Sequence, residues 1–276
     1  ILAEMRASDV AIPARLTNEA TGIVVPIDPS VFATEIERLA LETTRVSLLR
    51  ELSDTERALE LVVDLDLRRE GSVRKLQLLA TGDGGLTVSI IGAGVGNPLD
   101  LSRFAGSLRG RVSSDDMGSI SEFFGADVSG TGDLLFWTDA SAGQASTVFE
   151  VTGDALFPAS DARLPSMAFS VNGTAILDSN ESLINIAQAA VTLKQGPVQF
   201  NDINVGLTTT GWELLVNDLD LASGAQLLLE AGLIPESGRE PLAAASISGT
   251  INALSLSGSL FDESIERVAV DFDDIF

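Results

Sequence analysis

Alternation of apolar and polar residues with a period of two is the feature that most constrains the fold of this chain. From Leu59 to Leu67 every odd position is apolar, and Glu60, Asp64 and Asp66 stand between them. Successive side chains of a β-strand point to opposite faces, so this pattern predicts a half-buried strand with one apolar and one acidic face. Related patterns recur at 73–80, 86–92, 147–151, 167–171, 189–193, 198–207, 212–221, 246–258 and 267–274.

Turn signals separate these predicted strands. Gly82–Gly85 reads Gly-Asp-Gly-Gly, and Gln195–Pro197 divides two further apolar runs. Such residues accept the backbone angles that hairpins require, so we expect antiparallel neighbours at both places. Between Val216 and Leu219 the apolar phase shifts by one residue, which indicates a β-bulge.

Helical patterns are few and short. Residues 115–125 begin with two acids, carry Met117, Ile120 and Phe124 on one stripe, and end at Gly125. Weaker helical patterns occupy 225–233 and 235–245. The chain is therefore expected to be mainly β, with a meandering antiparallel sheet and a few short helices.

Composition excludes much catalytic chemistry. The 276 residues include no His and no Cys, so a Ser-His-Asp triad, an imidazole metal ligand, a thiolate nucleophile and a disulfide are all ruled out. A net charge of −23 argues against a nucleic-acid surface, which needs a basic stripe. We expect no catalytic residues, no cofactor and no metal site, and therefore no enzyme.

The remaining polar motifs have ordinary structural interpretations. Gly92, Gly94 and Gly96 resemble a dinucleotide-binding loop only loosely, because no βαβ unit surrounds them, and we interpret them as a loop between antiparallel strands. The Asp-x-Asp pairs, at 64/66, 218/220 and 271/273, are interpreted as solvated strand faces, although convergence of two pairs would suit a glycosidase. Trp137 and Trp212 are interpreted as packing anchors.

Three segments resemble a known family. Leu227–Phe276 has a leucine-rich part with Pro, then a small-residue stretch and two strands, as in the YhdP/TamB-type branch of the AsmA-like proteins. Residues 196–224 are similar to the recurring unit of that branch, in which a G-W-x-L strand follows a hairpin, and 119–137 resembles its helix-then-G-x-G-x-L passages. The resemblance covers the chain from Asp116 onward, whereas residues 1–100 share only the β pattern.

The resemblance implies a bridge-like lipid transfer protein. Such proteins are anchored in the inner membrane, cross the periplasm and are thought to carry phospholipid toward the outer membrane. Their fold is an elongated, strongly curved antiparallel sheet, a half-pipe or taco-like groove with an apolar inner face. On this basis we expect residues 1–276 to be one continuous periplasmic segment of a longer, inner-membrane-anchored envelope protein, with 1–114 and 115–276 as successive sub-modules. Parts of the parent chain outside this segment would contact the two membranes.

The alternation itself supplies a candidate lining for such a groove, because acyl chains need a continuous apolar surface. The lining residues that we predict are Leu61, Val63, Leu65, Leu76, Leu78, Val88, Ile90, Phe149, Val151, Phe169, Val171, Val191, Leu193, Leu214 and Val216. The same alternation could instead fill the closed core of a structural or adhesive β-domain of an envelope or surface protein. Composition does not separate these two functions.

Overall fold

The computed structural model describes residues 4–7, 14–16, 23–24, 37–52, 55–96, 104–123, 129–141, 143–156, 167–178, 181–193, 196–208, 210–230, 236–245, 247–259 and 265–273. The chain divides into two compact units, Ile1–Ala145 and Ser146–Phe276, called unit 1 and unit 2. The expected boundary between sub-modules at 114/115 falls inside unit 1.

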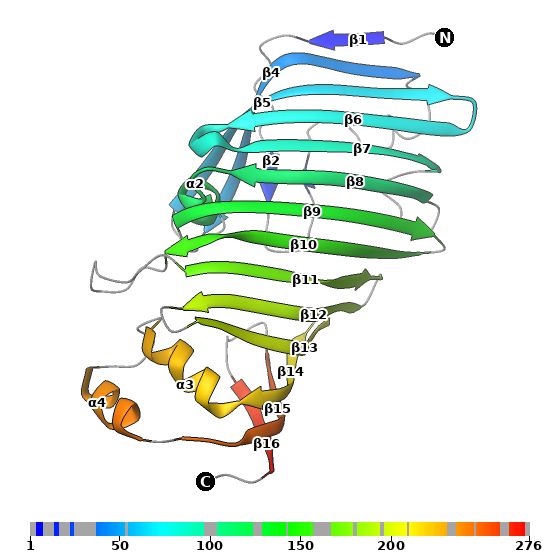
Figure 1. Cartoon of the computed structure of the whole chain (residues 1–276). Helices are drawn as coiled ribbons and strands as arrows, with labels where there is room; N and C mark the ends of the chain where they lie inside the picture. Colours follow the sequence, from blue (N-terminus) through cyan, green and yellow to red (C-terminus); the bar gives the residue numbers. More distant parts are fainter. Residues whose placement is uncertain are drawn as a thin grey trace. The chain divides into compact units, whose positions relative to one another are not determined.

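Unit 1 is an antiparallel meander with additional strands at its N-terminal side (Figure 1). Its strands are β1 (Glu4–Ala7), β2 (Ala14–Leu16), β3 (Ile23–Val24), β4 (Arg38–Leu52), β5 (Thr55–Glu70), β6 (Val73–Gly82), β7 (Thr87–Val95), β8 (Ala105–Ser114) and β9 (Ser129–Ser141). From β4 to β9 each strand pairs with the next in antiparallel orientation, while β1 and β2 pair with β4 in parallel orientation.

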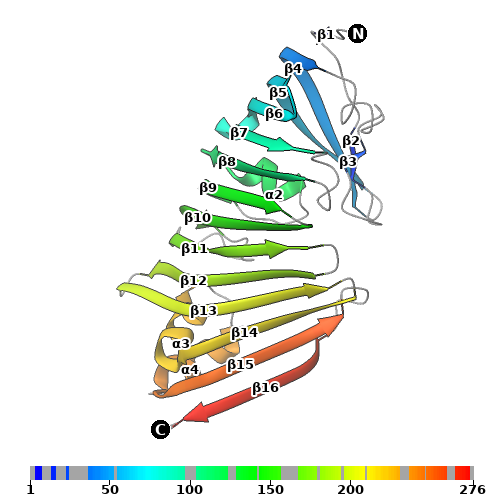
Figure 2. The same ribbon diagram turned by 90° about the vertical axis from the view of Figure 1, so that its right-hand side faces the viewer.

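The pair β4–β5 extends beyond the rest of this meander. Pairing of β5 with β6 stops at Leu61 opposite Gly82, whereas β4 and β5 remain paired as far as Leu52 opposite Thr55. We call the part of β4 and β5 beyond that point the arm; Figure 2 shows it reaching β2 and β3. At Thr43 the backbone takes a φ of 48°, the register shifts, and the Thr43 N–H donates to Asp64 Oδ1 at 2.7 Å.

Unit 2 is a second meander in which each strand neighbours the next. Its strands are β10 (Gln144–Leu156), which begins just before the unit boundary, β11 (Met167–Leu177), β12 (Glu181–Leu193), β13 (Gly196–Thr208), β14 (Gly211–Asp220), β15 (Thr250–Ser259) and β16 (Ile265–Asp273). Helices α3 (Leu221–Glu230) and α4 (Glu236–Ala244) lie between β14 and β15 in the chain (Figure 1). The two helices contact each other, and α3 also packs against β13 and β14.

The predicted fold class, mainly β with antiparallel strands and few short helices, is confirmed. The turn at 82–85 is the 3₁₀ turn η1 (Asp83–Gly85), and the expected helix at 115–125 is α2 (Gly118–Phe123). Both weaker helical patterns also form helices, as α3 and α4. Across the described part of the chain, no helix is long and apolar enough to cross a lipid bilayer.

A line of irregular pairing crosses strands β12 to β15 of unit 2. The β11–β12 register shifts between Asn172 and Gly173, where Ala187 of β12 has no partner. The β12–β13 ladder skips Ala187 and Asp202, and the β14–β15 ladder skips Asp218 and Asn252, in both cases without a register shift. Asp202 and Asp218 have φ values of 53° and 52°, which Asp tolerates better than most residues. The bulge expected between Val216 and Leu219 falls at Asp218, where the pairing of β14 with β15 is interrupted but the register of the two strands does not shift.

The Asp202 carboxylate links three strands by hydrogen bonds at the line of irregular pairing. Asp202 accepts hydrogen bonds from the side-chain amides of Asn217 at 2.7 Å, Asn204 at 3.1 Å and Asn185 at 3.4 Å. These hydrogen bonds, that of Asn217 foremost, hold the pKa of Asp202 below its ordinary value. The carboxylate therefore stabilises the fold while it is ionised.

The Asp202→Asn variant tests this role, because Asn keeps the tolerance for a left-handed backbone but removes the charge. The pKa of Asp202 is lower in the folded state than in the unfolded state. The carboxylate therefore contributes fully to the free energy of unfolding above the ordinary pKa of Asp, and this contribution is lost as the pH falls through the folded-state pKa. We expect the variant to be less stable than the wild type at pH 7 and equal to it near pH 2. Urea denaturation at several pH values measures this.

Asp218→Asn is the matched control, since it makes the same charge change at a left-handed residue of the neighbouring strand. Among the described residues, no side-chain amide donates to Asp218. A loss of stability that is equal in the two variants, or that does not depend on pH, would contradict the proposed role of Asp202.

Candidate functional site

Strand register gathers the apolar positions of unit 1 on one side of its sheet. Leu65 lies opposite Leu78, and Leu78 lies opposite Ile90; directly opposed residues share a face. We call this side the apolar face of unit 1. Its large apolar members are Leu61, Val63, Leu65, Leu67, Leu76, Leu78, Val88, Ile90, Leu108, Val112, Leu134 and Phe136.

All the predicted lining residues of unit 1 lie on this face. Val63 is buried, with 6% of its surface exposed, and the others are half-buried. Sequence reasoning missed the members from β8 and β9. In β8, glycines occupy two of the positions that face the apolar side, Gly106 and Gly110. Only Leu108 and Val112 therefore show the alternation of a strand.

One end of the apolar face of unit 1 is covered. Leu59 of the arm and Leu86 after η1 are buried together, and Leu61, Val88 and Ile120 of α2 pack against them. Helix α2 contacts both β5 and β9, and Asp116 caps its first turn through a 2.9 Å hydrogen bond from the N–H of Gly118. Two predicted lining positions, Leu61 and Val88, therefore belong to a small core at this end.

A flat aromatic ring covers the other end. Phe104 is buried with Ala140 and Ala145, and its ring lies over Gly94 and Gly106. A Cβ atom at Gly94 would collide with that ring. The predicted loop at 92–96 is therefore wrong for Gly92 and Gly94, which lie inside β7 and leave space for side chains of β8 and the segment before it.

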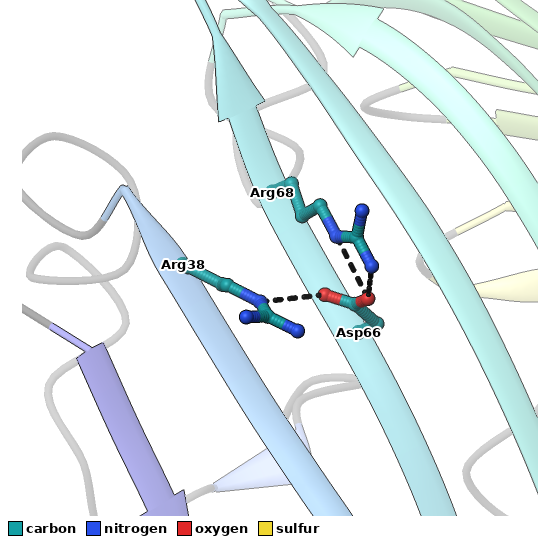
Figure 3. Close-up of polar contacts among 3 residues, drawn as sticks. All are labelled: Arg38, Asp66 and Arg68. Atoms are coloured by element: carbon teal, nitrogen blue, oxygen red, sulfur yellow. Dashed lines mark hydrogen bonds and ion pairs between the residues drawn. The ribbon is translucent and has the colours of Figure 1, made fainter.

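The opposite side of the unit 1 sheet is charged. Asp66 accepts hydrogen bonds from Arg68 Nε at 2.8 Å and from Arg38 Nε at 3.4 Å, and Arg111 forms an ion pair with Asp133 (Figure 3 shows the Asp66 group). The hydrogen bond from Arg68 is the main cause that lowers the pKa of Asp66. Asp66 and Asp133 are thus paired with arginines on this face.

Apolar side chains are scattered on the charged side of unit 1 as well. Leu79, Ile91 and Trp137 point there and are 43%, 36% and 49% exposed. The interpretation of Trp137 as a packing anchor is therefore wrong. A shallow depression of about 740 Å³ lies beside Trp137, between Arg68, Lys75 and Asp139.

Unit 2 also has an apolar face. Phe169 lies opposite Val191, which lies opposite Val198, and Val216 lies opposite both Ile203 and Leu254. The members fixed by register are Phe169, Val171, Ile184, Ile186, Val191, Leu193, Val198, Phe200, Ile203, Val205, Leu207, Trp212, Leu214, Val216, Leu254, Leu256, Val268 and Val270.

The predicted lining residues of unit 2 lie on this face. Gly173 lies opposite Ile186, so a Cβ atom at Gly173 would point to the apolar face. The Phe149 ring lies on the same face, because it would stand 3.0 Å from that Cβ atom. Val151, two residues further along β10, shares the side of Phe149. At one end α3 covers the face, where Leu227 packs against the buried cluster of Met167, Leu193 and Val198.

Three carboxylates of the Asp-x-Asp pairs have structural roles. Asp64 accepts the N–H of Thr43 at the register shift of β4, and Asp66 accepts hydrogen bonds from Arg38 and Arg68. Asp220 accepts the N–H of Ser223 at 2.8 Å as the N-cap of α3. In the described ranges, no group of three acidic side chains could hold a metal ion. No family model, curated protein or solved structure gives a significant match to this chain.

The close contact between Gly94 and Phe104 generates a prediction. Gly94→Val should lower the free energy of unfolding by about 1–3 kcal/mol, because the new side chain collides with the ring. Ala93→Val, on the exposed side of the same strand, should change it by less than about 0.5 kcal/mol. In a Phe104→Ala background the Gly94→Val penalty should fall but not vanish, because the new Cβ would still stand 2.9 Å from the Ala105 carbonyl oxygen; a penalty that Phe104→Ala leaves unchanged would contradict this packing. Urea denaturation measures all of these variants.

Proposed function

We propose that this chain is a segment of a lipid conduit that carries phospholipid acyl chains along its apolar sheet faces. The parent protein would be of the AsmA-like, YhdP/TamB type, anchored in the inner membrane and crossing the periplasm toward the outer membrane. The one observation that carries the proposal is that each unit has one sheet face formed mainly by apolar side chains, whose central members remain half-buried.

Acyl chains bind such a face more favourably than a polar ligand would, because they bury apolar surface on it. Each methylene that leaves water for an apolar surface gains about 0.8 kcal/mol. Along the centre of the unit 1 face, the row Leu65, Leu78, Ile90, Gly110 and Phe136 contains no polar side chain. Lipid carriage of this kind needs shape and apolar area but no covalent step.

Neighbouring residues on opposite faces provide a matched test. Leu78 and Leu79 are adjacent in β6, and only Leu78 is on the apolar face; Leu79 is 43% exposed on the other. We expect phospholipid to co-purify with the wild type and with Leu79→Asp, and to be reduced at least about tenfold in Leu78→Asp, because an aspartate there places a charge against acyl chains. Native mass spectrometry and phosphate analysis of solvent extracts measure the bound lipid.

Circular dichroism and urea denaturation establish that each variant is folded. Ile90→Asp and Ile91→Asp repeat the comparison on β7. Equal lipid content in the folded variants of both faces, or none in the wild type, would contradict the conduit and favour a structural β-domain whose apolar faces are ordinary packing surfaces.

A further inference from the structure

The depression on the charged side of unit 1 lies beside the half-exposed side chain of Trp137. Small side chains form its floor, where Ala93 of β7 lies opposite Ser107 of β8. The same row continues to Lys75 of β6 on one side and to Asp139 of β9 on the other, and both have longer side chains. From β6 to β9 the row crosses three strand spacings, or about 14 Å. The depression therefore has the width and the volume of a ligand site.

The neighbouring row supplies apolar surface to the depression. Ile91 lies opposite Arg109, which lies opposite Trp137. Ile91 and Trp137 are 36% and 49% exposed, so both present apolar atoms to solvent in the middle of a charged sheet face. The face of an indole ring carries partial negative charge, which attracts the partly positive C–H groups on the flat side of a sugar ring. Trp137 is therefore a platform on which such a ring stacks.

Three exposed polar side chains that line the depression have no side-chain partner among the described residues: Gln77, Arg109 and Asp139. The Arg109 guanidinium only donates hydrogen bonds, the ionised Asp139 carboxylate only accepts them, and the Gln77 amide does both. A sugar hydroxyl group also donates and accepts. Neighbouring hydroxyl groups of one saccharide therefore match all three side chains.

The charges of the depression favour a neutral ligand. The charged residues that line it are three cations and three anions: Arg68, Lys75, Arg109, Asp66, Glu70 and Asp139. Because these charges balance, a charged ligand gains little net attraction there, and an anionic ligand is also repelled by the net charge of −23 of the chain. A neutral ligand with hydroxyl groups and flat apolar sides fits both the polar and the apolar residues of the depression.

We propose that this depression binds a neutral oligosaccharide of N-acetylated amino sugars, with one sugar ring stacked on Trp137. Hydroxyl groups of the saccharide hydrogen-bond to Arg109 and Asp139. Gln77 lies opposite Ile91, so one acetamido group reaches both: its methyl group covers Ile91, and its amide hydrogen-bonds to the amide of Gln77. The site is on the charged side of the sheet, so the proposal does not depend on lipid binding to the apolar face.

Chitotetraose, a neutral tetramer of N-acetylglucosamine, is the probe, and cellotetraose, which lacks the acetamido groups, is the control ligand. We expect calorimetric titration of the chain with chitotetraose to give a dissociation constant of about 1 mM or below, and cellotetraose to bind at least about tenfold more weakly. Trp137→Ala and Asp139→Ala should each weaken chitotetraose binding at least about tenfold. Leu79→Ala removes an exposed apolar side chain from the same side of the sheet, outside the depression, and should leave binding unchanged.

Fluorescence gives a second readout, because the chain contains two Trp residues. In Trp212→Phe all indole emission comes from Trp137, and chitotetraose should shift and quench it. In Trp137→Phe the emission of Trp212 should not respond, and circular dichroism establishes that each variant is folded. A wild type that does not bind chitotetraose, equal affinity for cellotetraose, or binding that Trp137→Ala leaves unchanged would overturn the proposal.

Discussion

Hydrogen bonding between neighbouring antiparallel strands is the constraint on which the rest of this structure depends. It fixes register, and register decides which side chains share a face. Because the ladder places Leu65, Leu78 and Ile90 in one row, the apolar residues of separate strands become a single surface. The same ladder puts Asp66 and its arginines on the other side, where they form ion pairs in contact with water.

Local coverings and bends then shape these surfaces. Ile120 of α2 and Leu227 of α3 each close one end of an apolar face, and the ring of Phe104 closes another end of the face in unit 1. Between these closures the apolar side chains stay half-buried, which is the basis of the proposed lipid binding. In unit 2, Asp202 joins β12, β13 and β14 at the line of irregular pairing through its hydrogen bonds to three Asn side chains.

Period-two alternation predicted many of the strands and the faces of their residues, because both follow from local geometry. It did not predict β4, β8 or β9, and in β8 the alternation is interrupted by Gly106 and Gly110. It did not predict that Leu61 and Val88 would be covered, since that depends on contacts of the arm and α2 with residues distant in sequence. It also mistook Gly94 for a loop residue, because a glycine that makes room for Phe104 looks the same in sequence as one that makes a turn. The interpretation of Trp137 as a packing anchor fails because its side of β9 faces solvent, which depends on the strand pairing and not on the residue type.

The central claim is that acyl chains lie on the apolar face, and site-specific photocrosslinking along β6 tests it most directly. A benzophenone amino acid would replace each residue from Lys75 to Thr81 in turn, and phospholipid adducts would be quantified by mass spectrometry. We expect adducts at Leu76, Leu78 and Ala80, and few at Lys75, Gln77, Leu79 and Thr81, because only the first set lies on the apolar face. Adducts that show no period of two, or none at any position, would contradict it.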